Sequence, residues 1–131
     1  LAGAQGGCQA ECGSAAAMAA AAVGQLMGGR PAQCFHAGAI AIKNMLGLVC
    51  DPVAGLVEIP CIKRNAGGVL QALGAADLAL SGVESYIPFD DTVEAMNRVG
   101  NAMPAALRET ALGGLATTAS GKEMRERIYG A

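Results

Sequence analysis

The sequence of 131 residues lacks tryptophan, and its aromatic residues are limited to two Tyr and two Phe. Charged residues are also scarce, at 15% against about 25% in typical soluble domains. A disordered segment is excluded, because disorder requires high charge and low hydrophobicity, whereas 53% of these residues are apolar. Nine Lys and Arg against eleven Asp and Glu leave a net charge of −2, which argues against a nucleic-acid partner.

Long runs of strongly apolar residues are missing too. Residues 12–29 carry no charge over 18 positions, which is long enough for a membrane span. They are mainly Ala and Gly, however, and these contribute little to membrane insertion. A secretory signal, with its basic start and apolar core, is not visible. We therefore expect a cytoplasmic protein without a membrane partner, whose cysteines are reduced.

The sequence is rich in small residues, with 28 Ala and 19 Gly, which let helix backbones approach closely. Charge is nearly missing from the first third, since residues 1–50 contain only Glu11, Arg30 and Lys43. A free domain needs a wetted face over its whole length, so we expect a partner, or chain absent here, to cover this third. Because the sequence begins at Leu1 rather than Met, we also expect a fragment or a processed product.

Apolar residues recur at helical spacing along almost the whole chain, and no segment with strand periodicity is long enough for a sheet. Asp91 and Glu94 form an Asp version of a capping box, which predicts a helix start. A loop is expected at residues 117–121. The fold class is therefore all-α, a compact Ala/Gly-rich multi-helix bundle. The expected helices cover residues 8–27, 31–49 with a stop at Asp51-Pro52, 61–80, 91–103, 105–112 and 121–129.

The five cysteines do not form a C-x-x-C pair, which argues against a zinc ribbon, a thioredoxin-like site and a ferredoxin-type run. Cys8 and Cys61 fall in the first turns of expected helices, where backbone N–H groups and the helix dipole stabilise thiolates. Cys50 falls on an irregular segment before a proline. These three make a plausible metal site. Cys12 and Cys34 lie within helices and look like packing residues. Composition alone favours the simpler interpretation that all five are small buried hydrophobes.

Four segments carry a resemblance to a known family. They are residues 7–11 (Gly-Cys-Gln-Ala-Glu), the long block 43–65, residues 86–90 (Tyr-Ile-Pro-Phe-Asp) and residues 109–116. Together they closely resemble the iron–sulfur-dependent L-serine dehydratases, in the C-terminal part of the alpha chain of the two-subunit form. The resemblance covers residues 1–131 as one portion of a larger helical catalytic domain. It implies a [4Fe–4S] cluster bound by Cys8, Cys50 and Cys61.

The resemblance also implies a reaction. Three cysteine ligands leave one iron open, and an open iron can act as a Lewis acid on the β-hydroxyl of L-serine. Elimination of water then leads to pyruvate and ammonia, without pyridoxal phosphate. Arg64, Asn65 and Lys43 flank the cluster cysteines and are candidates for binding substrate. The alternative for Arg64 is a purely structural pairing with Asp51 or Glu58.

The general base is not evident, and we expect it outside this chain. His36, the only histidine, lies on an apolar helix and is expected to be structural, while Asp51 is expected to shape the Cys50 loop. The family also has a preceding alpha-chain segment and a beta subunit or domain. We expect both as partners in an oligomer, with this chain inactive alone.

Three other functions stay open at this point. A related cluster-dependent cysteine lyase (a desulfidase) would share the elimination chemistry. An electron carrier would need Cys12 or Cys34 as a fourth ligand. A helical interaction module would leave all the cysteines inert.

Overall fold

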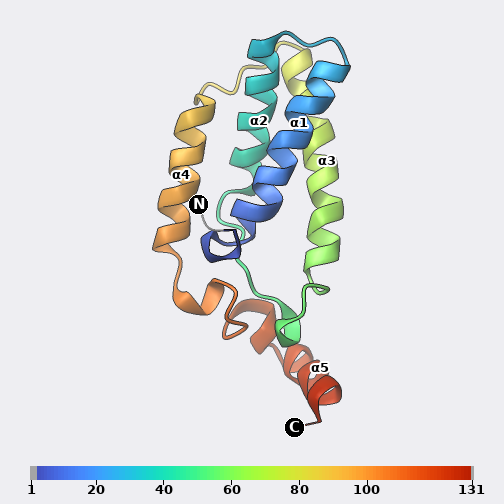
Figure 1. Ribbon diagram of the computed structural model, residues 1–131, viewed down its shortest axis with the longest axis vertical. Coiled ribbons are helices and arrows are strands. Elements are labelled where there is room, and N and C mark those ends of the chain that lie inside the picture. Colours follow the sequence, from blue (N-terminus) through green and yellow to red (C-terminus); the bar gives the residue numbers. More distant parts are fainter. Residues whose placement is uncertain (1–2, 131) are drawn as a thin grey trace.

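The structure is a computed structural model that describes residues 3–130. It confirms the all-α prediction, since the described residues form helices and no strand, with one isolated bridge between Cys50 and Arg108. The α-helices are α1 (Ser14–Leu26), α2 (Pro31–Met45), α3 (Cys61–Leu80), α4 (Phe89–Ala102) and α5 (Ala119–Tyr129). Figure 1 shows α1 to α4 arranged as a bundle, with α5 below them.

Helices α1, α2 and α3 pack against one another, and α4 packs against α2. Their contacts are made largely by alanine: Ala20, Ala37 and Ala41 are completely buried. Because a methyl group adds little thickness to a helix, three backbones can approach closely around such positions. Larger side chains, such as Met45 and Met96, fill the end of the core nearest to the N-terminal turns. The small-residue composition thus produces a narrow, tightly packed bundle.

The first predicted helix is present but divided. Residues Gln9–Gly13 form a π-helix, which continues directly into α1. A π-helix closes its hydrogen bonds over one residue more than an α-helix and is common at functional sites. The start of α3 at Cys61 and its end at Leu80 agree with the prediction.

The predicted extent of the second helix is wrong. Helix α2 ends at Met45, because Leu46 turns to an extended conformation (ψ 136°) and Gly47 adopts a left-handed one (φ +86°). Residues 46–52 therefore run as an irregular segment before the short 3-10 helix η3 (Val53–Gly55). Cys50 lies on this segment, so it is on irregular backbone as expected.

The second half of the chain needs three further corrections. Helix α4 begins at Phe89, after Pro88, so Asp91 lies inside the helix and does not cap it. The predicted helix over residues 105–112 is reduced to the 3-10 turn η4 (Ala105–Leu107). Helix α5 begins at Ala119, within the predicted loop, because the side-chain oxygen of Thr118 accepts a hydrogen bond from the Gly121 N–H (3.1 Å).

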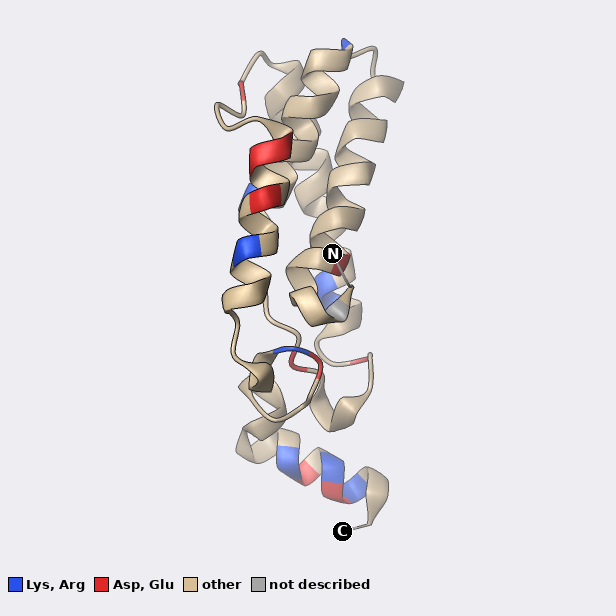
Figure 2. Ribbon diagram, turned by 60° about the vertical axis from the view of Figure 1, so that its left-hand side comes forward, with Lys and Arg blue, Asp and Glu red and all other residues tan. Residues whose placement is uncertain are grey.

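Charged residues are unevenly distributed over this fold. Figure 2 shows them on α4 and α5, whereas by sequence α1 carries no Lys, Arg, Asp or Glu and α2 carries only Lys43. Helix α5 contacts η3 and the 3-10 turn η5 (Gly114–Thr117). None of the helices in the described part of the chain is both long and apolar enough to cross a membrane.

Candidate cysteine-lined site

A cavity of about 440 Å³ opens where the N-terminal turns, the segment after α2 and the start of α3 meet. Four of the five cysteines line it. The three predicted ligands, Cys8, Cys50 and Cys61, are joined there by Cys12. Arg64, Asn65, Glu11 and Glu109 contribute polar groups to the same wall. Residues that are distant in sequence thus share one sulfur-rich, partly charged pocket.

Cys8 is positioned by the residues on either side of it. Gly7 has a positive φ (+83°), and a Cβ there would lie 2.7 Å from the Leu48 carbonyl oxygen, so the turn requires glycine. Gln9 is completely buried, and its Nε2 donates to the carbonyls of Gly6 and Met96, both at 2.9 Å. Its Oε1 accepts from the Gly47 N–H at 3.0 Å. One side chain thereby ties the Cys8 turn to the end of α2 and to α4.

Sequence reasoning did not identify Gln9. The available signal was weak: a polar residue beside a glycine pair and a cysteine in an otherwise small-residue segment. Its partners lie 38 and 87 positions away. No pattern of spacing predicts such contacts.

Cys50 is held by the backbone of a distant segment. Its N–H donates to the Leu107 carbonyl at 2.9 Å, and its carbonyl accepts from the Glu109 N–H at 3.1 Å. This two-bond pairing is the isolated bridge of the fold. The segment that follows α4 therefore sets the position of Cys50.

Asp51 fixes the same loop from its other side. Its carboxylate is 3% exposed and accepts from Arg64 Nη1 (2.8 Å) and from the Leu115 N–H (2.7 Å). Arg64 Nη1 also donates to the Val49 carbonyl at 2.8 Å. The expectation that Asp51 shapes the Cys50 loop agrees with these contacts, and the partner of Arg64 is Asp51, not Glu58.

Cys61 is the first residue of α3, and Asn65 lies one turn later. Asn65 Nδ2 donates to the Cys61 carbonyl at 3.0 Å. Cys12, on the π-helix, places its Sγ 3.3 Å from Cys8 Sγ and 3.5 Å from Asn65 Oδ1. Cys12 is buried, as expected of a packing residue, but it is also part of the cavity wall. Cys34 is only partly buried and does not line this cavity.

Burial changes the acidity of these thiols. It raises the pKa of Cys50 to about 11, with Glu109 and Glu11 adding to the effect. Burial and the neighbouring Cys8 raise the pKa of Cys12 to about 12. Burial also raises the pKa of Cys61, although Arg64 opposes the shift. The expected stabilisation of a thiolate by the helix end is thus outweighed by burial at Cys61.

The neutral thiol forms of Cys12, Cys50 and Cys61 are therefore favoured, and a bound cationic group would favour their thiolate forms instead. In the part of the chain that the structure describes, no three His, Cys, Asp or Glu side chains are close enough together to hold a single metal ion. The cysteines that line the cavity come from several separate elements.

Comparison with known proteins identifies the family. The family model described as "Serine dehydratase alpha chain" matches residues 1–116. The chain belongs to this family. The "L-serine dehydratase, alpha chain" of Peptoniphilus asaccharolyticus is 62% identical over 125 residues, which cover 95% of this chain and 43% of that protein. The "Probable L-serine dehydratase, alpha chain" of Bacillus subtilis (strain 168) is 58% identical over 130 residues, covering 99% of this chain and 43% of its relative.

The "L-serine dehydratase TdcG" of Escherichia coli (strain K12) is 46% identical over 117 residues, 88% of this chain and 26% of the relative. The chain therefore spans less than half the length of each of these three relatives.

Two candidate residues lie away from the cysteine-lined cavity. Lys43 Nζ donates to the Ser85 carbonyl, and Lys43 is not among the residues that line the cavity. His36 Nδ1 accepts from the Ser85 N–H at 3.2 Å. Both residues connect α2 to the segment between α3 and α4, which agrees with a structural role for His36.

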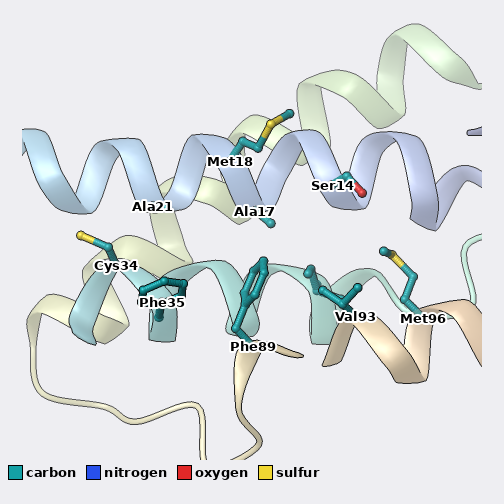
Figure 3. Close-up of a pocket in the computed structure, with 10 residues that line it drawn as sticks. Ser14, Ala17, Met18, Ala21, Cys34, Phe35, Phe89, Val93 and Met96 are labelled. Atoms are coloured by element: carbon teal, nitrogen blue, oxygen red, sulfur yellow. The ribbon is translucent and has the colours of Figure 1, made fainter. Parts of the chain in front are cut away.

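A second cavity of about 340 Å³ lies between α1, α2 and α4. Figure 3 shows Phe89 pointing towards Ala17 of α1, with Val93 and Met96 beside it. The rings of Phe35 and Phe89 meet edge to face with centroids 6.0 Å apart. Apart from Ser14 and Cys34, the residues that line this second cavity are apolar. The cavity therefore offers a hydrophobic surface and little reactive chemistry.

Proposed function

We propose that this chain supplies the cluster-binding part of an iron–sulfur-dependent L-serine dehydratase, which converts L-serine to pyruvate and ammonia. The observation that carries the proposal is the meeting of Cys8, Cys50 and Cys61, from three separate segments, at one cavity. The named function of the relatives supports the same substrate.

The residues fit a [4Fe–4S] cluster. Thiolates are the usual protein ligands of such clusters, and the cavity has room for a group larger than a single ion. Each candidate ligand is fixed by its own contacts: Cys8 through Gln9, Cys50 through the backbone of residues 107–109, and Cys61 at the start of α3. When bound through three cysteines, the cluster supplies an open iron as a Lewis acid for the leaving hydroxyl group.

The chain's own polar residues can bind the rest of the substrate. Among the described residues, the side-chain hydrogen bonds of Arg64 are made by Nη1. The guanidinium group has five N–H donors, so its other nitrogens remain for a substrate carboxylate, which arginine binds well. Asn65 offers an amide at the same wall, and Glu11 and Glu109 offer carboxylates for the substrate ammonium group. We place the general base outside this chain.

The larger assembly is part of the proposal. We propose that the preceding segment of the alpha chain and a beta subunit or domain complete the active site in a cytoplasmic oligomer. The chain's share of its relatives' length, 43% for the two alpha chains, supports this division.

Anaerobic reconstitution with iron and sulfide tests the proposal. The chain should bind about four irons and four sulfides, Cys50→Ala should lose most of the iron, and Cys34→Ala should lose none. Without the other parts of the enzyme, the reconstituted chain should form no pyruvate from serine. With them, serine should be preferred over cysteine. A chain that binds no iron, or equal iron loss in both variants, would contradict the proposal, and sulfide release from cysteine would favour the desulfidase.

A further inference from the structure

Cys12 is a buried cysteine of the cavity wall that the proposed function does not use. It is 5% exposed, and its sulfur lies between two groups, Cys8 Sγ at 3.3 Å and Asn65 Oδ1 at 3.5 Å. Asn65 is itself anchored to the Cys61 carbonyl. Cys12 therefore connects two of the candidate ligands through side-chain contacts.

Cys12 is poorly placed to be a ligand itself. Each cysteine of a [4Fe–4S] cluster binds a different iron, so the ligand sulfurs are held well apart. Sulfur atoms at 3.3 Å are too close for that arrangement. Two thiolates at this distance would also repel each other strongly. The contact instead has the length of a hydrogen bond that involves sulfur.

The direction of this hydrogen bond depends on the protonation of Cys8. In the metal-free chain the contacts run head to tail: the Cys8 thiol donates to Cys12 Sγ, and the Cys12 thiol donates to Asn65 Oδ1. A ligand cysteine has lost its proton and can only accept. Cys12 has one proton to give, and an anionic sulfur is a stronger acceptor than a neutral amide oxygen.

We propose that Cys12 is a positioning residue whose thiol donates a hydrogen bond to the cluster-bound Cys8 thiolate, and that it thereby releases Asn65 Oδ1 to the cavity. This inference rests on the cluster of the proposed function. Hydrogen bonds to ligand sulfurs help to set the reduction potential of a cluster. A donor at Cys8 withdraws negative charge from the cluster and makes its oxidation harder.

Three variants of the reconstituted chain test this role. Cys12→Val keeps approximately the volume and removes the donor, Cys12→Ser restores a donor, and Cys34→Val is the control at a cysteine outside the cavity. In limited oxygen, the cluster absorbance of Cys12→Val should decay about tenfold faster than that of the wild type, which corresponds to the weaker end of the range for one hydrogen bond to a charged group. Cys12→Ser and Cys34→Val should decay at nearly the wild-type rate.

Vibrational spectroscopy gives a second measurement that a purely structural role would not change. The S–H stretching band that disappears in Cys12→Val should move to lower frequency when the wild-type chain takes up its cluster. Equal decay rates in Cys12→Val and wild type, both fully loaded with iron, would overturn the inference and leave the cluster proposal intact. An unshifted band would do the same. A wild-type chain that binds no iron would overturn both.

Discussion

Replacing Gln9 with leucine should destabilise the chain strongly, even though the two side chains are similar in size. Gln9→Leu keeps the length and approximate volume of a completely buried side chain and removes its polar atoms. Three hydrogen bonds disappear: two donated to the carbonyls of Gly6 and Met96, and one accepted from the Gly47 N–H. Gly47 is exposed, so water can replace the acceptor that its N–H loses, whereas Gly6 and Met96 are buried.

The magnitude follows from this difference in exposure. A buried polar group left without a partner costs about 1–3 kcal/mol. The Gly6 carbonyl carries this full cost, whereas the Met96 carbonyl lies inside α4 and keeps its helical hydrogen bond, so the loss of its second bond adds only about 1 kcal/mol. We therefore expect Gln9→Leu to lower the free energy of unfolding by about 3 kcal/mol. This is a large part of the total stability of a small domain.

Urea unfolding, followed by the helical circular dichroism signal, measures the effect. Gln25→Leu is the matched control, because the same change is made at an exposed position near the end of α1. It should change the free energy of unfolding by less than about 0.5 kcal/mol. If Gln9→Leu and Gln25→Leu were equally stable, the argument that Gln9 holds the Cys8 turn would be refuted.

Two further predictions concern the Cys50 loop. Gly114→Ala should destabilise the chain by about 3 kcal/mol, because a Cβ at Gly114 would collide with the buried Asp51 carboxylate. Gly55→Ala, also at positive φ but with open space around it, should cost only about 1 kcal/mol, and equal urea unfolding of the two would contradict the collision. In the metal-free chain, alkylation of Cys50 by iodoacetamide should keep accelerating above pH 9.0, because burial raises the pKa of its thiol to about 11. A rate that levels off near pH 9, as expected for the urea-unfolded chain, would show that the thiol is not shifted.

The sequence predicted the helices best where their ends have local causes. Pro60 marks the start of α3 and the Gly28-Gly29 pair follows α1, and both cues act within one or two residues. The end of α2 was missed because Leu46 and Val49 continue the apolar spacing of the helix. Only the left-handed conformation of Gly47 interrupts it. Glycine permits that conformation but does not require it.

The candidate site was predicted residue by residue rather than as a whole. Helix-end reasoning and the family resemblance both selected Cys8, Cys50 and Cys61. Neither could show that Cys12 joins them, because that depends on how the π-helix faces Asn65 of α3. The position of Cys50 depends on backbone bonds to residues 107–109, and a backbone contact leaves no trace in side-chain identity.

The π-helix between Cys8 and α1 has a consequence for the rotational phase of the helix. In an α-helix each residue advances by about 100° around the axis, so one extra residue in a turn rotates everything before it relative to everything after it. Residues after Gly13 keep the phase that buries Ala16 and Ala20 in the bundle. Residues before it take a different phase, which points Cys8 and Cys12 at the cavity. One continuous helical segment therefore presents one set of residues to the bundle core and, with a different rotational phase, its cysteines to the cavity.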